Sequence, residues 1–281
     1  MDNTDKPQNL VSEKLKKGRT LVNALGIPGL LFIIWLGGIY FTMLMSVVIF
    51  LALKEFYGIY KEKGIYASFP LGLVGAVFFI WFYHTEPYIN MLSFLQWVFV
   101  FTLFAFVVEL FSKKDNPASN LAYTLLGIFY IPMLLGSLIA IRQMDMTYST
   151  HFTFAIFISV WICDSAAFGF GTKWGKKKIL PRVSPDKSWV GCIAGFVSVF
   201  IFFNILSYFN LPSLDFSIQD IFIFSIISGI FGQLGDFTES LFKRDIGIKD
   251  SSSFLLGHGG VLDRFDSLIF VAPLSYFYMV F

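Results

Sequence analysis

The residues best suited to chemistry are concentrated between Ser240 and Asp266, in the segment SLFKRDIGIKDSSSFLLGHGGVLDRFD. Its 27 residues include four acids, four bases and His258, although 56% of the chain is hydrophobic. A charged side chain at the centre of a membrane helix costs about 2.5–3.5 kcal/mol, so such a cluster predicts a function. Mixed charge with glycines is also what a site for a polyphosphate and a divalent cation requires. We therefore interpret the segment as a candidate active site.

Two pairs of acids are spaced three residues apart, which places each pair on one face of a helix. Asp236 and Glu239 end one apolar stretch, and Asp263 and Asp266 begin the next. We expect the two helices to run antiparallel and to bring the four carboxylates to one depth. Oxygen ligands of this kind suit Mg²⁺, which usually takes one or two carboxylates plus phosphates and water. In the alternative interpretation, Glu239 pairs with the bases that follow it as part of an interfacial charge belt.

The same segment contains groups that could bind phosphate. Gly259 and Gly260 let the backbone pass close to a ligand. His258 could donate a hydrogen bond to a phosphate, and its alternative interpretation is a polar loop residue. The candidate catalytic residues of the segment are Lys243, Arg244, Lys249, His258 and Arg264.

A second polar cluster lies between Asp164 and Gly191. Asp164 falls within an apolar stretch, where an unpaired aspartate should face the interior of a helix bundle. The run Ser184-Pro185-Asp186-Lys187-Ser188 could present two hydroxyls and an ammonium around a turn that proline fixes. Lys176 to Lys178 could bind phosphate, but for at least two of the three we favour an anchor for anionic lipid. The glycines of this cluster do not form a Walker A motif.

Apolar stretches of about 20 residues must position these clusters, and each is long enough to cross about 30 Å of hydrocarbon. Charged residues make up only 14% of the chain and the mean hydropathy is +0.70, which excludes an ordinary soluble domain. The stretches are too long and too uniformly apolar for barrel strands. We predict an all-α polytopic membrane protein with nine transmembrane helices, at residues 22–38, 39–56, 66–84, 88–112, 119–141, 152–172, 189–209, 218–242 and 262–281. The first two are divided at Gly37-Gly38.

The basic residues predict the orientation of these helices. With the N-terminus in the cytoplasm, 20 of the 21 Lys and Arg fall in cytoplasmic regions and only Arg142 does not. The C-terminus is then external. A net charge of +2 gives no reason to expect nucleic-acid binding. We divide the chain into a cytoplasmic segment (1–21), N-terminal transmembrane helices (22–150) and a catalytic transmembrane region whose site faces the cytoplasm (151–281).

The segment from Ser240 to Asp266 resembles the signature of the CDP-diacylglycerol synthases, also called phosphatidate cytidylyltransferases. That signature reads S-x-x-K-R-x4-K-D and then H-G-G-x-x-D-R-x-D, and every fixed position is filled here. The resemblance extends upstream through GDFTES, SPDKSWVG and CDSAAFGFG, and covers about residues 155–281. The chain departs from the family at Asp164-Ser165-Ala166-Ala167, where a glycine and a further aromatic residue are common, and at Asp186, a variable position.

The resemblance implies that phosphatidic acid attacks the α-phosphorus of CTP, forming CDP-diacylglycerol and releasing pyrophosphate. It implies Asp236 and Asp263 as the first choice of ligands for Mg²⁺. The ligating or supporting acids for Mg²⁺ and a second cation are then Asp266, Glu239 and Asp164. The implied phosphate-neutralising residues are Lys187, Lys243, Arg244, Lys249 and Arg264. Ser184 and Ser188 would hydrogen-bond the nucleotide.

The resemblance also implies a homodimer in contact with membrane lipids, and we expect it in the bacterial inner membrane. Two other activities would use a similar architecture: a CTP-dependent kinase of polyprenol or phytol, and a cytidylyltransferase for an archaeal ether lipid. An ion-coupled transporter is a third alternative. The charges of such a transporter would lie at the membrane midplane, whereas the charges of this chain concentrate at one membrane face. Gly191 and Gly195 could mediate a helix contact within one chain or between two chains.

Overall fold

The computed structural model describes residues 26–61, 63–88, 90–144, 146–209, 214, 216–248 and 259–281. Within these ranges the regular elements are helices, with one isolated antiparallel bridge between Lys178 and Ser188. A helix at Gly26–Leu36 comes first. It is followed by α2 (Gly38–Lys61), α3 (Phe69–Thr85), α4 (Met91–Leu110), α5 (Pro117–Ile128), the π-helix η1 (Phe129–Met133), α6 (Ser137–Gln143), α7 (Met146–Trp174), α8 (Trp189–Tyr208), α9 (Ile218–Ile226), the π-helix η2 (Ile227–Phe231), α10 (Gly232–Asp245) and α11 (Leu262–Val280).

Six helical stretches in the described part of the chain are long and apolar enough to cross a membrane. They are Gly38–Lys61, Met91–Leu110, Pro117–Gln143, Tyr148–Trp174, Trp189–Tyr208 and Ile218–Asp245. Gly26–Leu36 and Phe69–Thr85 are shorter apolar helices, and α11 has 19 residues. For the described residues, the prediction of an all-helical chain with membrane-crossing helices is confirmed. The count of nine spans and the orientation remain predictions.

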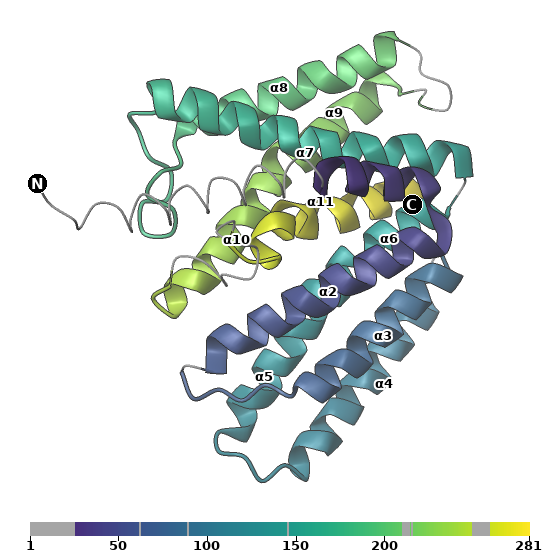
Figure 1. Ribbon diagram of the computed structural model, residues 1–281, viewed down its shortest axis with the longest axis vertical. Helices are drawn as coiled ribbons and strands as arrows, with labels where there is room; N and C mark the ends of the chain where they lie inside the picture. The colour runs from purple at the N-terminus through teal and green to yellow at the C-terminus, as the bar shows by residue number, and fades with distance from the viewer. Residues whose placement is uncertain are drawn as a thin grey trace, which may run out of the picture.

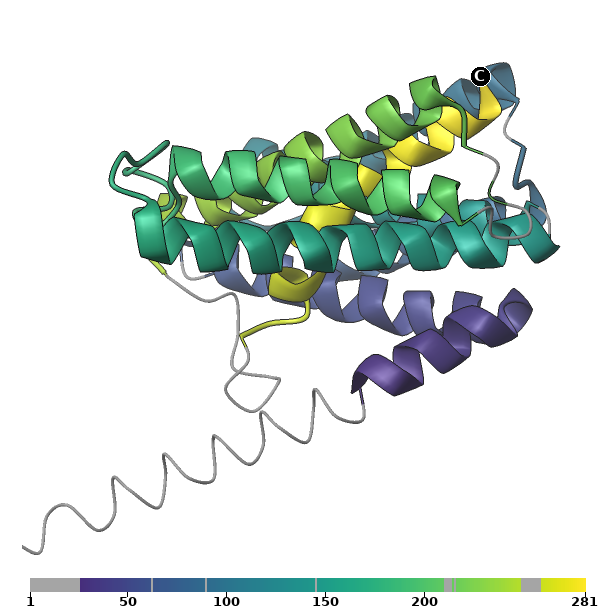
Figure 2. The ribbon, with the colours of Figure 1, turned by 90° about the horizontal axis from the view of Figure 1, so that it is seen from above.

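The helices pack as a bundle in which α2, α3 and α4 run obliquely to α7 and α8 (Figures 1 and 2). Figure 1 shows α7 and α8 along one side and α3 and α4 along the other, with α2, α6 and α11 between them. At one end Lys63 of the loop after α2 pairs with Asp245, the last residue of α10. At the opposite end the Tyr276 hydroxyl donates to the Pro87 carbonyl at 2.8 Å. The end of α2 therefore lies beside the end of α10, and the loop between α3 and α4 lies beside α11.

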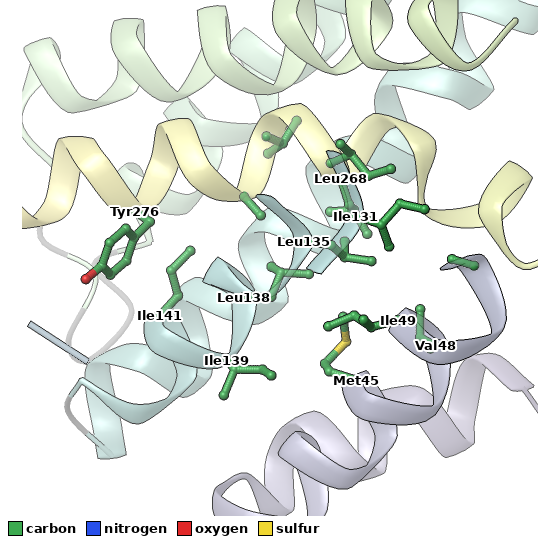
Figure 3. Packing of buried hydrophobic residues seen from close by; sticks show 14 of the residues in the cluster. Met45, Val48, Ile49, Ile131, Leu135, Leu138, Ile139, Ile141, Leu268 and Tyr276 are labelled. Carbon is green, nitrogen blue, oxygen red and sulfur yellow. The ribbon is translucent and has the colours of Figure 1, made fainter. Parts of the chain in front are cut away.

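A single apolar core joins the N-terminal and C-terminal helices. Figure 3 shows Val48 and Ile49 of α2 near Ile131 of η1, with Leu138 of α6 and Leu268 of α11 in the same cluster. All five side chains are buried. η1 and α6 therefore pack between α2 and α11 and connect them. α11 carries two of the predicted site aspartates.

The first apolar stretch breaks at Gly37, at the predicted division. Gly37 and Gly38 have φ angles of 63° and 48°, which glycine adopts readily. Arg142 of α6 enters the break and donates from Nε to the Ile34 carbonyl at 2.9 Å and from Nη2 to the Trp35 carbonyl at 3.2 Å. A Cβ atom on Gly37 would overlap the guanidinium. Arg142 thus caps the C-terminal end of the helix that begins at Gly26.

Candidate active site

A cavity of about 580 Å³ is lined by seven of the fifteen predicted site residues: Asp164, Ser184, Lys187, Ser188, Asp236, Asp263 and Asp266. It opens between α7, α8, α10, α11 and the loop at residues 175–188. Five carboxylates, two lysines and two serines line it: Asp164, Asp186, Asp236, Asp263, Asp266, Lys178, Lys187, Ser184 and Ser188. Residues of both polar clusters that the sequence indicated, one before residue 200 and one after it, thus line the same cavity.

Glycines allow the helices around the cavity to approach closely. A Cβ atom on Gly235 of α10 would lie 2.6 Å from the Asp266 carbonyl oxygen of α11. A Cβ atom on Gly191 of α8 would lie 2.6 Å from the Ala167 carbonyl oxygen of α7. Real Cβ atoms do not come so near, so larger residues would separate these helices. Gly191 and Gly195 both face α7, which makes theirs a contact within one chain.

The π-helix η2 leads directly into α10 and precedes Asp236 by one turn. Gln233 lies at this junction and donates from Nε2 to the Gly229 carbonyl at 2.5 Å and to the Cys192 carbonyl at 3.1 Å. It therefore ties η2 to α8, and it also lines the cavity. Single-turn π-helices often occur at functional sites. Gln233 was not predicted from the sequence, although its amide lies among three glycines in an apolar stretch.

Lys187 belongs to the polar lining of the cavity. Its ammonium forms an ion pair with Asp236 and lies 4.4 Å from the centroid of the Phe237 ring. Ser188, the next residue, accepts a hydrogen bond from the Gly191 amide at 3.2 Å and so caps α8. Lys178 donates to the Asp186 carbonyl at 2.9 Å and also lines the cavity. Of the three lysines interpreted as a lipid anchor, this one is turned toward the site.

A buried ion-pair group links α10 to α11 beside the cavity. The Lys243 ammonium lies 2.5 Å from Glu239 Oε2 and 2.8 Å from Asp263 Oδ1. The other Asp263 oxygen accepts the Gly260 amide at 2.6 Å. Glu239 is 1% exposed and is not among the residues that line the cavity. Its geometry suits it to hold the Lys243 ammonium, because a buried charge requires a partner.

The remaining predicted residues lie around this centre. Arg244 donates from Nε to the Val183 carbonyl at 3.1 Å and from Nη1 to the Ile248 carbonyl at 3.0 Å, which fastens the serine-containing loop to the end of α10. Arg264 is exposed and does not line the cavity. Gly259 has a φ angle of 78°, which favours glycine. Lys249 and His258 lie outside the described residues.

The donor set of the cavity fits Mg²⁺ by its chemistry. Among the described residues, no three His, Cys, Asp or Glu side chains come together as a ready-made metal cluster. Mg²⁺ does not need such a cluster, since one or two carboxylates with substrate phosphates and water suffice. Asp236 and Asp263 each form an ion pair with a lysine here, and Asp164 and Asp266 share the same lining.

Known proteins match almost the whole chain. The model of the cytidylyltransferase family matches residues 17–281. A phosphatidate cytidylyltransferase of Staphylococcus aureus (strain COL) is 30% identical over 260 residues, which cover 92% of this chain and 96% of that protein. The proteins of the same name from Bacillus subtilis (strain 168) and Haemophilus influenzae (strain ATCC 51907 / DSM 11121 / KW20 / Rd) are each 31% identical. Their alignments cover 93% and 85% of this chain and 96% and 90% of the relative.

These matches extend well beyond residues 155–281, where the sequence motifs lie, and include the N-terminal helices that carry no motif. The family model thus matches both the motif residues that line the cavity and the helices that support them. The chain belongs to the cytidylyltransferase family.

Proposed function

We propose that this chain is a Mg²⁺-dependent phosphatidate cytidylyltransferase, which converts CTP and phosphatidic acid to CDP-diacylglycerol and pyrophosphate. The observation that carries the proposal is the cavity lined by Asp164, Asp236, Asp263, Asp266 and Lys187 within a bundle of apolar helices. Carboxylates and ammonium groups together suit a polyphosphate that arrives with a divalent cation. The names of the relatives support the same activity.

The proposed reaction needs little covalent chemistry from the protein. A phosphate oxygen of phosphatidic acid forms a bond to the α-phosphorus of CTP. The bond from that phosphorus to the bridging oxygen of the β-phosphate breaks, and pyrophosphate leaves with the electron pair. The nucleophile is already an anion, so a strong general base is unnecessary. Positioning and charge neutralisation then account for catalysis, as in phosphoryl transfer generally.

The cavity residues divide into two proposed groups. Lys187 and Lys178 would neutralise phosphate charge, with Ser184 and Ser188 as hydrogen-bond donors to the nucleotide. Asp236 and Asp263 would hold Mg²⁺, supported by Asp164 and Asp266. Bound Mg²⁺ would withdraw charge from the phosphates and favour the departure of pyrophosphate. In the same proposal Lys243, Arg244, Lys249 and Arg264 neutralise phosphate charge, and His258 donates a hydrogen bond to a phosphate.

We place the cavity at the cytoplasmic surface of a bacterial inner membrane. CTP is a cytosolic solute, whereas phosphatidic acid has its head group at the interface and its chains in the bilayer. The proposal therefore includes nine membrane-crossing helices, a cytoplasmic N-terminus and an external C-terminus. Labelling of single cysteines introduced before Gly26 and after Phe281 would test the orientation. Light scattering of the protein in detergent would test the homodimer, which the family resemblance implies.

The activity is tested with purified protein in detergent, phosphatidic acid, Mg²⁺ and CTP labelled at the α-phosphorus. We expect label in a chloroform-soluble product and one pyrophosphate released for each product. Chelation of Mg²⁺ should abolish the transfer and leave the protein folded. Transfer of a γ-label to an isoprenoid alcohol, with no α-label in lipid, would contradict the proposal and identify a kinase.

A further inference from the structure

Glu55 of α2 reaches the first turn of α11 and accepts two of its backbone amides. Its Oε1 lies 3.0 Å from the Val261 nitrogen and its Oε2 lies 2.9 Å from the Leu262 nitrogen. The preceding amide, that of Gly260, donates to Asp263 at 2.6 Å. Three consecutive amides at the start of α11 are therefore accepted by two carboxylates, and one of these carboxylates comes from the opposite half of the chain.

The sequence at the start of α11 cannot supply this acceptor locally. The N-cap residue is Val261, whose side chain makes no capping hydrogen bond, and Gly259 and Gly260 have no side chains. The first amides of a helix need external acceptors, and a negative charge is favourable at this end of the helix dipole. Glu55, 206 residues before Val261, meets both needs.

We propose that Glu55 is a positioning residue for Asp263, and the inference rests on the proposed function of the cavity. Asp263 directly follows Leu262, and its carboxylate is the acidic group in the first turn of α11. Without the Glu55 carboxylate, the amides of Val261 and Leu262 would compete with Gly260 for Asp263. The Asp263 carboxylate would then turn away from the cavity that it lines.

The packing of α2 makes Glu55 a rigid support. Phe56, the next residue, is fully buried and its ring meets that of Phe242 of α10 edge-on, with centroids 5.6 Å apart. Lys63, just beyond α2, pairs with Asp245 at the end of α10. Thus α2 contacts both helices that carry the proposed metal-binding aspartates, and Glu55 is the point at which it holds α11.

The test uses Glu55→Gln, which is close in size but has one carbonyl-type oxygen and an NH₂ group that cannot accept the second amide. We expect kcat to fall by about 10- to 100-fold, as for other groups that orient metal ligands. We also expect the Mg²⁺ concentration at half-maximal rate to rise by about tenfold or more. The KM for CTP should change little, because the nucleotide-facing lysines and serines are not altered. Lys54→Gln, an exposed neighbour on the same helix, is the matched control and should resemble the wild type.

A second measurement does not depend on activity. In the metal-free protein, hydrogen exchange of the Val261 and Leu262 amides should be slow, and at least about tenfold faster in Glu55→Gln. Unchanged exchange and unchanged Mg²⁺ dependence would overturn the inference, as would equal losses in Glu55→Gln and Lys54→Gln. If Glu55→Gln fails to fold, the same exchange measurement is made on Glu55→Asp and on the wild type. Rapid exchange of the Val261 and Leu262 amides in the wild type would reject the proposed role of Glu55. A wild type without cytidyl transfer would contradict the proposed function alone.

Discussion

The N-terminal helices and the cavity end of the C-terminal helices are packed in opposite ways. In the N-terminal helices, large side chains such as Phe41, Phe56 and Phe79 are fully buried and fill the space between helices. Around the cavity, glycines at positions 191 and 235 bring the backbones together instead. Close backbone contact holds helices in place without large side chains, which leaves room for polar groups and a substrate. We therefore propose that the first region supports the second and that the chemistry takes place in the glycine-packed region.

The largest expected effect comes from removing a carboxylate in the glycine-packed region. Asp236→Asn retains shape but loses the charge that pairs with Lys187, and we expect cytidyl transfer at saturating Mg²⁺ to fall by at least about a hundredfold. Asp245→Asn, on the same helix but outside the cavity lining, is the control and should retain most activity. Near-normal turnover of Asp236→Asn would remove this aspartate from the proposed metal site.

A large-to-small substitution in the N-terminal helices should change stability but not chemistry. Phe79→Ala would leave a void in a fully buried position of α3 and should lower the free energy of unfolding by about 3 kcal/mol. The protein that remains folded should have a normal kcat. Unfolding in mixed micelles, compared with the exposed Val77→Ala, measures the first effect. A large fall in kcat per folded molecule would show that the packing comparison is wrong.

The converse change adds a methyl group between α10 and α11. Gly235→Ala would place a Cβ atom 2.6 Å from the Asp266 carbonyl oxygen, so the two helices must separate. We expect a loss of about 1–3 kcal/mol of stability, together with a fall in activity that exceeds the loss of folded protein. Gly169→Ala on α7 adds the same methyl group where no atom lies within 4 Å and should be neutral. Equal behaviour of the two variants would contradict the proposed importance of close approach.

The smallest expected effect concerns a hydrogen bond between α7 and η2. The Ser159 hydroxyl donates to the Ser228 hydroxyl at 2.9 Å, and both side chains are buried. Hydrogen bonds between membrane helices are worth about 0.6 kcal/mol on average, so Ser159→Ala should cost about that much. Ser225→Ala, which loses a bond only within its own helix, is the control for the same unfolding measurement. A cost of several kcal/mol for Ser159→Ala would mean that η2 depends on this bond.

Hydropathy predicted where the helices lie, because a long apolar stretch has few other stable forms in a membrane. The three-residue spacing of Asp263 and Asp266 also predicted that the two aspartates share a helix face, and both line the cavity. The rotation of α2 was not predictable, since that helix is apolar on most sides and its pattern does not mark one buried face. Glu55 itself was visible as an acid within a predicted span, which should have marked it as functional. Its partners were not visible, because they are backbone amides 206 residues away.

The same limit applies to the lysines of the site. The family resemblance implied that Lys187 and Lys243 neutralise phosphate. The alternative interpretation, in which Glu239 pairs with a base that follows it, agrees with the Glu239–Lys243 ion pair. Neither interpretation predicted that Asp263 shares Lys243, or that Lys178 is turned toward the cavity. These distinctions depend on side-chain direction at the ends of α10 and in the loop after α7, where spacing gives little information. The π-helix before Gln233 is a further irregularity that periodicity does not reveal.

The burial of Arg142 has a consequence for the positive charge that the folded protein exposes to the two sides of the membrane. This residue is the one base outside the predicted cytoplasmic regions, yet it is only 3% exposed and its guanidinium is bound to the carbonyls of Ile34 and Trp35. Orientation depends on the positive charge that loops present to the two sides of the membrane. In the folded protein the charge of Arg142 is held inside the bundle, so the one base that departs from the predicted charge bias is exposed to neither side of the membrane.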